Sequence, residues 1–137
     1  MHDGQRIRYA KQCPVHGSVD SAAIDLAKHA LRQMPGEPMY WNTLGVAHYR
    51  RDEWHSAVEA LEEAERLAPD KYFGFNAYFL AMCHHQLGDT AKAKDYFDGA
   101  GRWCQENQSK LSATHVRELQ AFRADAESLL RAPPPAR

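Results

Sequence analysis

The sequence predicts an all-α protein, a solenoid of helix-turn-helix units, and three observations lead to this fold class. Matching residues recur at fixed separations over more than half of the chain, and a period of 20–50 residues is typical of repeat architectures. Apolar residues recur at spacings of three and four, which places them on one side of a helix. Leu, Ala, Glu and Lys are frequent, and no segment is rich in Val, Ile and Thr.

The repeat has two consistent offsets. Pairs that lie 36 positions apart join the second unit to the third: Leu44 with Leu80, Gly45 with Ala81, His48 with His84, Ala57 with Ala93, Leu61 with Phe97, and Ala64 with Ala100. Pairs that lie 34 positions apart join the first unit to the second: Ala23 with Ala57, Ala30 with Ala64, and Pro35 with Pro69. The period is therefore 34 residues, with two extra residues within 70–74. We expect repeats at about 4–37, 38–71 and 74–107.

The first unit is the weakest copy. Its first helix would run from Gly4 to about Cys13, where Pro14 cuts it short, because proline cannot continue a helix. Its second helix, Ser21 to Met34, fits the pattern well. We therefore expect the first repeat to be degenerate.

The second and third units follow the pattern more fully. Two stripes define the helices of the second unit: Trp41, Leu44, Ala47 and His48 on one, and Ala57, Leu61 and Ala64 on the other. Gly45 and its counterpart Ala81 let a neighbouring helix approach closely, so a larger side chain would overpack the contact. In the third unit Gly88-Asp89 marks the turn, and Asp89 or Thr90 is suited to cap the next helix.

The C-terminal segment predicts one more helix and a tail. From about 111 to 131, apolar residues such as Val116, Leu119 and Phe122 follow helical spacing, and charged residues occupy the other side. A helix of this kind covers the exposed face of the last repeat. Residues 1–131 are thus expected to form a single domain, and 132–137 a disordered proline-rich tail.

The repeated residues resemble the tetratricopeptide-repeat (TPR) family. The second unit reads Trp41-x2-Leu44-Gly45-x2-His48, then Ala57-x3-Leu61, Ala64 and Pro69, which is similar to the family pattern W-x2-L-G-x2-Y…A-x3-F…P. The third unit has Ala77 in place of the tryptophan and no proline at its end. The phrases 40–50, 79–82, 86–89 and 117–127 also resemble bacterial, planctomycete-like TPR segments appended to serine/threonine kinases and other signalling proteins. No kinase motif is present in the sequence.

Composition argues against several classes of partner and location. The formal net charge is -1, which gives no overall basic field for nucleic acid or an anionic membrane. No run of about 18 apolar residues is present, and the polar start does not look like a signal peptide. The 3 cysteines do not form a secreted disulfide framework. We expect a cytoplasmic protein that binds neither nucleic acid nor membrane.

Histidine is frequent, with 8 in the chain, and a metal site is the sharper of two interpretations. Cys83-His84-His85 is the densest cluster, but consecutive helical residues point about 100° apart and cannot all face one ion. His48 and His84 share one repeat position, which favours a packing role. No phosphate-binding loop, dinucleotide motif or nucleophile elbow is present. We therefore expect no enzyme activity, no cofactor and no metal.

The resemblance implies a non-catalytic module that binds a short peptide or helix in a concave groove, which in TPR arrays is lined by the first helix of each unit. The expected partner-binding residues are Arg8, Gln12, Met39, Asn42, Val46, Tyr49, Arg50, Phe75, Tyr78, Met82 and His85. Only Arg8 sits where a cation of the family's carboxylate clamp would, because Tyr78 and Met82 occupy the matching places of the third unit. What remains is an aromatic and methionine-rich groove, of the kind favoured at binding surfaces.

Two alternatives stay open. Phe75, Tyr78 and Met82 are equally well explained as core residues or as residues covered by the chain's own helices. The module is alternatively structural, with its N-terminal end packed on a second copy, as in a homodimer, or on another domain.

Overall fold

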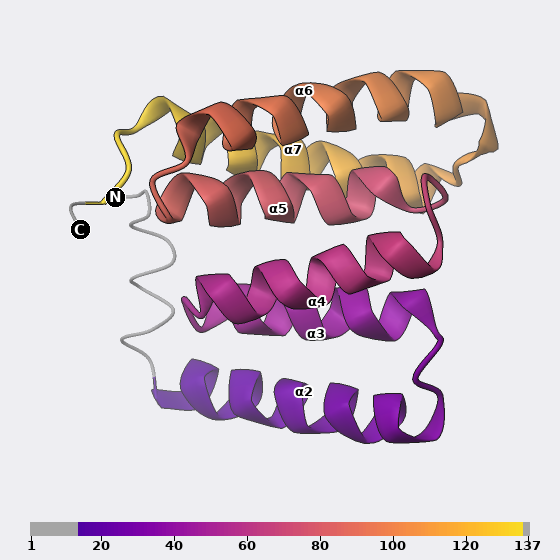
Figure 1. The fold of residues 1–137 in the computed structure, drawn as a ribbon. Coiled ribbons are helices and arrows are strands. Elements are labelled where there is room, and N and C mark those ends of the chain that lie inside the picture. The colour runs from indigo at the N-terminus through magenta and orange to yellow at the C-terminus, as the bar shows by residue number, and fades with distance from the viewer. Residues whose placement is uncertain (1–13, 136–137) are drawn as a thin grey trace. The chain divides into compact units, whose positions relative to one another are not determined.

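The computed structural model describes residues 14–135, and these residues form six α-helices, one short 3-10 helix and no strand (Figure 1). The predicted all-α helical-repeat fold class is confirmed for this range. The chain divides into two compact units, residues 1–69 and 70–137, and each is described by itself. The single domain over 1–131 stays a prediction. Within residues 14–135 no helix is both long and apolar enough to cross a membrane.

Unit 1 contains α2 (Pro14–Gln33), α3 (Pro38–Arg50) and α4 (Trp54–Leu67). α2 begins at Pro14 and not at the predicted Ser21. Proline suits the first position of a helix, since the N–H that it lacks has no partner inside the helix there. The predicted helix over 4–13 lies outside the described residues.

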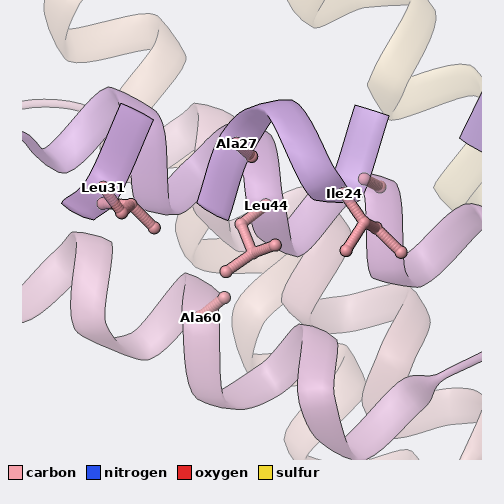
Figure 2. Packing of buried hydrophobic residues seen from close by; sticks show 6 residues of the cluster. Ile24, Ala27, Leu31, Leu44 and Ala60 are labelled. Atoms are coloured by element: carbon pink, nitrogen blue, oxygen red, sulfur yellow. The ribbon is translucent and has the colours of Figure 1, made fainter. Parts of the chain in front are cut away.

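All three helices contribute to the core of unit 1. α3 packs against both α2 and α4. The buried cluster consists of Ile24, Ala27 and Leu31 of α2, Leu44 and Ala47 of α3, and Ala60 of α4, and Figure 2 shows the close approach of these side chains. The spacing of three and four residues along α2 places its three members on one face.

Gly45 allows α3 and α4 to lie against each other. A Cβ atom at position 45 would lie 2.6 Å from Cγ of Leu61 and 3.3 Å from the carbonyl oxygen of Ala57. Carbon atoms in ordinary contact are about 3.5–4.0 Å apart. The predicted close approach at Gly45 is therefore confirmed.

A tight turn joins α3 to α4. The N–H of Glu53 donates to the carbonyl oxygen of His48 at 3.0 Å, and the N–H of Asp52 donates to that of Tyr49 at 2.9 Å. Asp52 has a left-handed backbone, with φ 61°. These two bonds around a left-handed residue make a Schellman motif, which closes a helix and reverses the chain.

Unit 2 contains α5 (Phe73–Gln86), α6 (Thr90–Asn107), the 3-10 helix η1 (Gln108–Lys110) and α7 (Ala113–Arg131). α5 packs against both α6 and α7. Every residue from Gly74 to His85 is buried, as expected for a helix with apolar residues on all sides.

The turn between α5 and α6 copies the turn of unit 1 at an offset of 36 residues. The N–H of Asp89 donates to the carbonyl oxygen of His84 at 2.8 Å, and Gly88 is the left-handed residue, with φ 89°. The carboxylate of Asp89 accepts a bond of 3.0 Å from the N–H of Lys92. The predicted turn is confirmed, and of the two predicted caps Asp89 is the residue that caps α6.

Trp103 anchors the start of unit 2. Its indole Nε1–H donates to the carbonyl oxygen of Asp70 at 2.6 Å. A Cβ atom on Gly74 would lie 2.7 Å from Cε3 of the Trp103 ring, so glycine makes room for the indole. Asp70 has a left-handed backbone, with φ 66°, and lies where the two extra residues were predicted.

α7 occupies most of the predicted range 111–131. Ser112 caps it by accepting a bond of 3.0 Å from the N–H of His115. Leu119, Ala126 and Leu129 are buried along one side. Residues 132–135 carry no helix, and the remainder of the predicted tail lies outside the described residues.

Candidate functional site

The predicted partner-binding residues of unit 1 lie on α3. Met39, Asn42 and Val46 are half-buried, and Arg50 at the C-terminal end of the helix is exposed. Tyr49 is buried at 7% exposure, and its ring lies 5.3 Å from that of Trp54 between centroids. Four of the five residues thus reach the surface to some degree, whereas Tyr49 packs under it.

Local hydrogen bonds fix the first turn of α3. Glu37 accepts a bond of 3.3 Å from the N–H of Met39, and Pro38 occupies the first position of the helix. The indole Nε1–H of Trp41 donates to the carbonyl oxygen of Pro35 at 2.8 Å, which ties the helix to the preceding turn. The hydroxyl of Thr43 donates to the carbonyl oxygen of Met39 at 2.9 Å. A capped first turn fixes the backbone of α3, so the helix itself needs little ordering on binding.

The predicted partner-binding residues of unit 2 lie on α5 and are buried. Phe75, Tyr78, Met82 and His85 are between 1% and 8% exposed. The Phe75 ring lies 6.2 Å from that of Trp103, and the Tyr78 ring lies 5.8 Å from that of Phe97.

Phe75 and Tyr78 therefore lie in the core, covered by the chain's own helices, as the alternative interpretation of these residues predicts. The Phe75 ring also meets that of His115 on α7 at 5.3 Å, edge to face. These contacts hold α6 and α7 against α5. A partner-binding role for the four residues of α5 stays a prediction.

Arg8 and Gln12 lie outside the described residues. The remaining predicted residues divide between the two units, with Met39, Asn42, Val46, Tyr49 and Arg50 in unit 1 and the rest in unit 2. The structure therefore brings the five residues of α3 together on one helix, and the four residues of α5 together on another. A groove that unites both sets stays a prediction.

The comparisons with known proteins bear on the repeat that contains α3. Residues 38–71 match the tetratricopeptide-repeat family. The matched segment covers α3, the Schellman turn and α4, with the boundaries that the sequence pattern predicts for the second repeat.

A TPR repeat-containing protein of Methanocaldococcus jannaschii is 30% identical to the chain over 79 residues. These residues are 57% of this chain and 13% of that protein, so the chain spans a small part of the length of the curated relative that it matches. Both comparisons support the TPR family.

Two histidines share one position of the repeat, His48 in unit 1 and His84 in unit 2. Nδ1 of His48 lies 2.7 Å from a carboxylate oxygen of Glu53, and this hydrogen bond lowers the pKa of Glu53. His84 is buried at 8% exposure and stacks on Tyr96, with ring centroids 5.6 Å apart. The predicted packing role is confirmed for His84, whereas His48 bonds to the residue that directly precedes α4. Over the described range, no three histidine, cysteine or acidic side chains come together as metal ligands would.

Unit 2 also contains a pocket that the sequence did not reveal. It has a volume of about 550 Å³ and lies between α6, η1 and α7, with Tyr78 of α5 among its lining residues. Arg123 of α7 lines it and lies over the Phe97 ring, with Cζ 5.0 Å from the ring centroid. No residue spacing indicated this pocket, because it depends on the distance between α6 and α7.

Proposed function

We propose that this chain is a non-catalytic protein-interaction module, and that its second TPR binds a short peptide or helix against α3. The main support is the surface of α3, which belongs to the repeat that matches the family. On this surface the side chains of Met39, Asn42 and Val46 are half-buried and that of Arg50 is exposed. TPR repeats generally mediate protein–protein interaction, which supports this function.

The chemistry of the α3 surface supports a ligand of mixed character. Met39 and Val46 offer flexible and branched apolar side chains, and methionine adapts to partners of varied shape. Arg50 adds a charged group with several N–H donors, of the kind enriched at binding hot spots. A peptide with an apolar residue followed by an acidic one would satisfy both features.

The module is also proposed to be a segment of a larger bacterial signalling protein in the cytoplasm. The likeness to TPR segments appended to kinases supports this context. The length of the matched relative, of which 13% aligns with this chain, supports a larger protein.

The test is a selection of binding peptides from a random peptide library on the full chain, followed by affinity measurements. A double variant, Met39→Ala with Arg50→Ala, is expected to lower the affinity for the selected peptides by about tenfold or more, since hot-spot side chains each contribute over 1 kcal/mol to binding. A second double variant, Glu62→Ala with Arg66→Ala on the exposed side of α4, is the matched control and is expected to bind as the natural chain does. Equal affinity of both double variants for every peptide would refute the assignment to α3.

Self-assembly is the second candidate function, and one observation favours it. Leu26 and Met34, on and just after α2, are 70% and 53% exposed. Contact with a second copy would remove both apolar side chains from water. Sedimentation velocity at several concentrations is expected to show a dimer that Leu26→Glu dissociates. A monomer at all concentrations would remove this candidate.

A further inference from the structure

The pocket of unit 2 has the size of a ligand site. Pockets that bind small molecules or chain ends have volumes of about 300–1,000 Å³, and this one has about 550 Å³. Its lining combines polar side chains of α6, η1 and α7 with the apolar side chains of Phe97 on α6, Leu111 after η1, and Val116 and Leu119 on α7. All of its lining residues belong to unit 2, so it shares no residue with the proposed peptide-binding surface on α3.

Three residues lie near the guanidinium of Arg123 in this pocket. It lies over the Phe97 ring at 5.0 Å, a cation–π contact. The hydroxyl of Tyr78 lines the same pocket: burial raises its pKa, and the nearby guanidinium of Arg123 opposes this rise. A Cβ atom on Gly101 would lie 2.9 Å from Nη1 of Arg123, so the guanidinium occupies the space that a side chain at 101 would take.

The charges around the pocket favour an anion. Among residues 21–135, whose side chains the structure describes, the ion pairs give Arg123 no carboxylate partner. Arg102 is a second arginine in the lining. Asp98 is the acidic group of the lining, and its carboxylate is already paired with Nζ of Lys94 at 2.6 Å. The lining therefore carries two cations and one acid whose charge a neighbouring lysine offsets.

We propose that this pocket binds the carboxylate of a ligand with an apolar body. The carboxylate accepts hydrogen bonds from Arg123, whose planar fork matches a carboxylate in geometry. The body lies against Leu111, Val116 and Leu119, which line the same pocket. Such a ligand is either a small aryl or alkyl carboxylic acid or the free C-terminus of a peptide that ends in an apolar residue.

The test is an NMR titration of the ¹⁵N-labelled full chain with matched probes. 4-Phenylbutyrate is compared with the neutral 4-phenylbutanol, and acetyl-leucyl-phenylalanine with its C-terminal amide. The carboxylates are expected to shift the resonances of Gly101 and Cys104 and to bind about tenfold tighter than the neutral probes, the difference that a charge-assisted hydrogen bond makes. The tighter of the two acids identifies the source of the ligand.

Variants assign the effect to Arg123. Arg123→Gln is expected to lower the affinity for the two acids to that for the neutral probes. Arg117→Gln, at another exposed arginine of α7, is expected to leave the affinity for the acids unchanged. Gly101→Ala displaces the guanidinium without removing its charge and is expected to lower the affinity for the acids severalfold. Alanine is a better helix former than glycine, so the variant is expected to fold.

Three results would overturn the proposal: no saturable shift with any probe, equal affinity for acid and neutral probe, or unchanged affinity in a folded Arg123→Gln chain. None of them bears on α3, so failure here is distinct from failure of the peptide-binding function.

Discussion

Replacement of Gly45 by alanine tests the helix packing on which the second repeat depends. In the structure a Cβ atom at position 45 would lie 2.6 Å from Cγ of Leu61 and 2.8 Å from Cδ2. Ordinary contact requires about 3.5–4.0 Å, so Leu61 must move by about 1 Å. The Cβ atom would also lie 3.3 Å from the backbone oxygen of Ala57, so a shift of α3 away from Leu61 gives it little extra room.

The expected net loss of stability follows from two opposing effects. Overpacking a core contact costs about 1–3 kcal/mol. Alanine is favoured over glycine inside a helix by about 1 kcal/mol, which offsets part of the cost. We expect Gly45→Ala to lower the free energy of unfolding by about 1–2 kcal/mol, measured by urea denaturation followed by circular dichroism at 222 nm.

Two further variants make the result specific. Gly36→Ala is the control, since a Cβ atom there meets nothing within 4 Å, and its effect is expected to stay within about 0.5 kcal/mol. In a double-mutant cycle, Leu61→Ala is expected to relieve the clash, with a favourable coupling energy of about 1 kcal/mol or more. A Gly45→Ala chain as stable as the natural one, or strictly additive effects with Leu61→Ala, would refute the contact.

Three other changes have defined outcomes. Gly88→Ala is expected to cost about 1–2 kcal/mol in thermal unfolding, since residue 88 has φ 89° and a left-handed backbone disfavours alanine; an unchanged melting temperature would contradict this. Ser112→Ala removes the cap of α7 and is expected to lower the free energy of unfolding by about 1 kcal/mol. Ser112→Asp keeps a capping side chain and is expected to retain most of this stability; equal losses of stability in both variants would argue against capping. Burial raises the pKa of the Cys83 thiol to about 12, so iodoacetamide at pH 8 is expected to leave Cys83 unmodified in the folded chain and to alkylate it after unfolding, as mass spectrometry reads out; rapid alkylation of the folded chain would contradict its burial.

Much of the fold was predictable because repeated residues carry repeated geometry. The offset of 36 positions aligns His48 with His84 and Asp52 with Gly88. In the structure His48 and Asp52 belong to the Schellman turn of unit 1, and His84 and Gly88 occupy the equivalent places in the Schellman turn of unit 2. The small residue at 45 indicated a close helix contact without any knowledge of the partner helix.

The start of α2 was harder to predict, because the effect of a proline depends on where a helix begins. Pro14 disfavours the middle of a helix yet suits its first position, so the residue type alone does not place the boundary. α2 begins at this proline.

The burial of α5 had a sequence signal that the repeat pattern obscured. From Phe73 to Cys83 the segment is apolar at nearly every position, which is typical of a helix covered on all sides. Alignment with the second repeat pointed instead to a surface role for Phe75, Tyr78 and Met82. The pocket around Arg123 was not predictable, since it depends on the distance between α6 and α7, which no residue spacing encodes.

The affinity of selected peptides for the α3 variants tests the central claim most directly. Fluorescence anisotropy with a labelled peptide would compare the natural chain with Met39→Ala plus Arg50→Ala and with the α4 control, Glu62→Ala plus Arg66→Ala. The account predicts an affinity about tenfold lower for the α3 variant alone. Equal affinity for all three chains, each folded by circular dichroism, would contradict it.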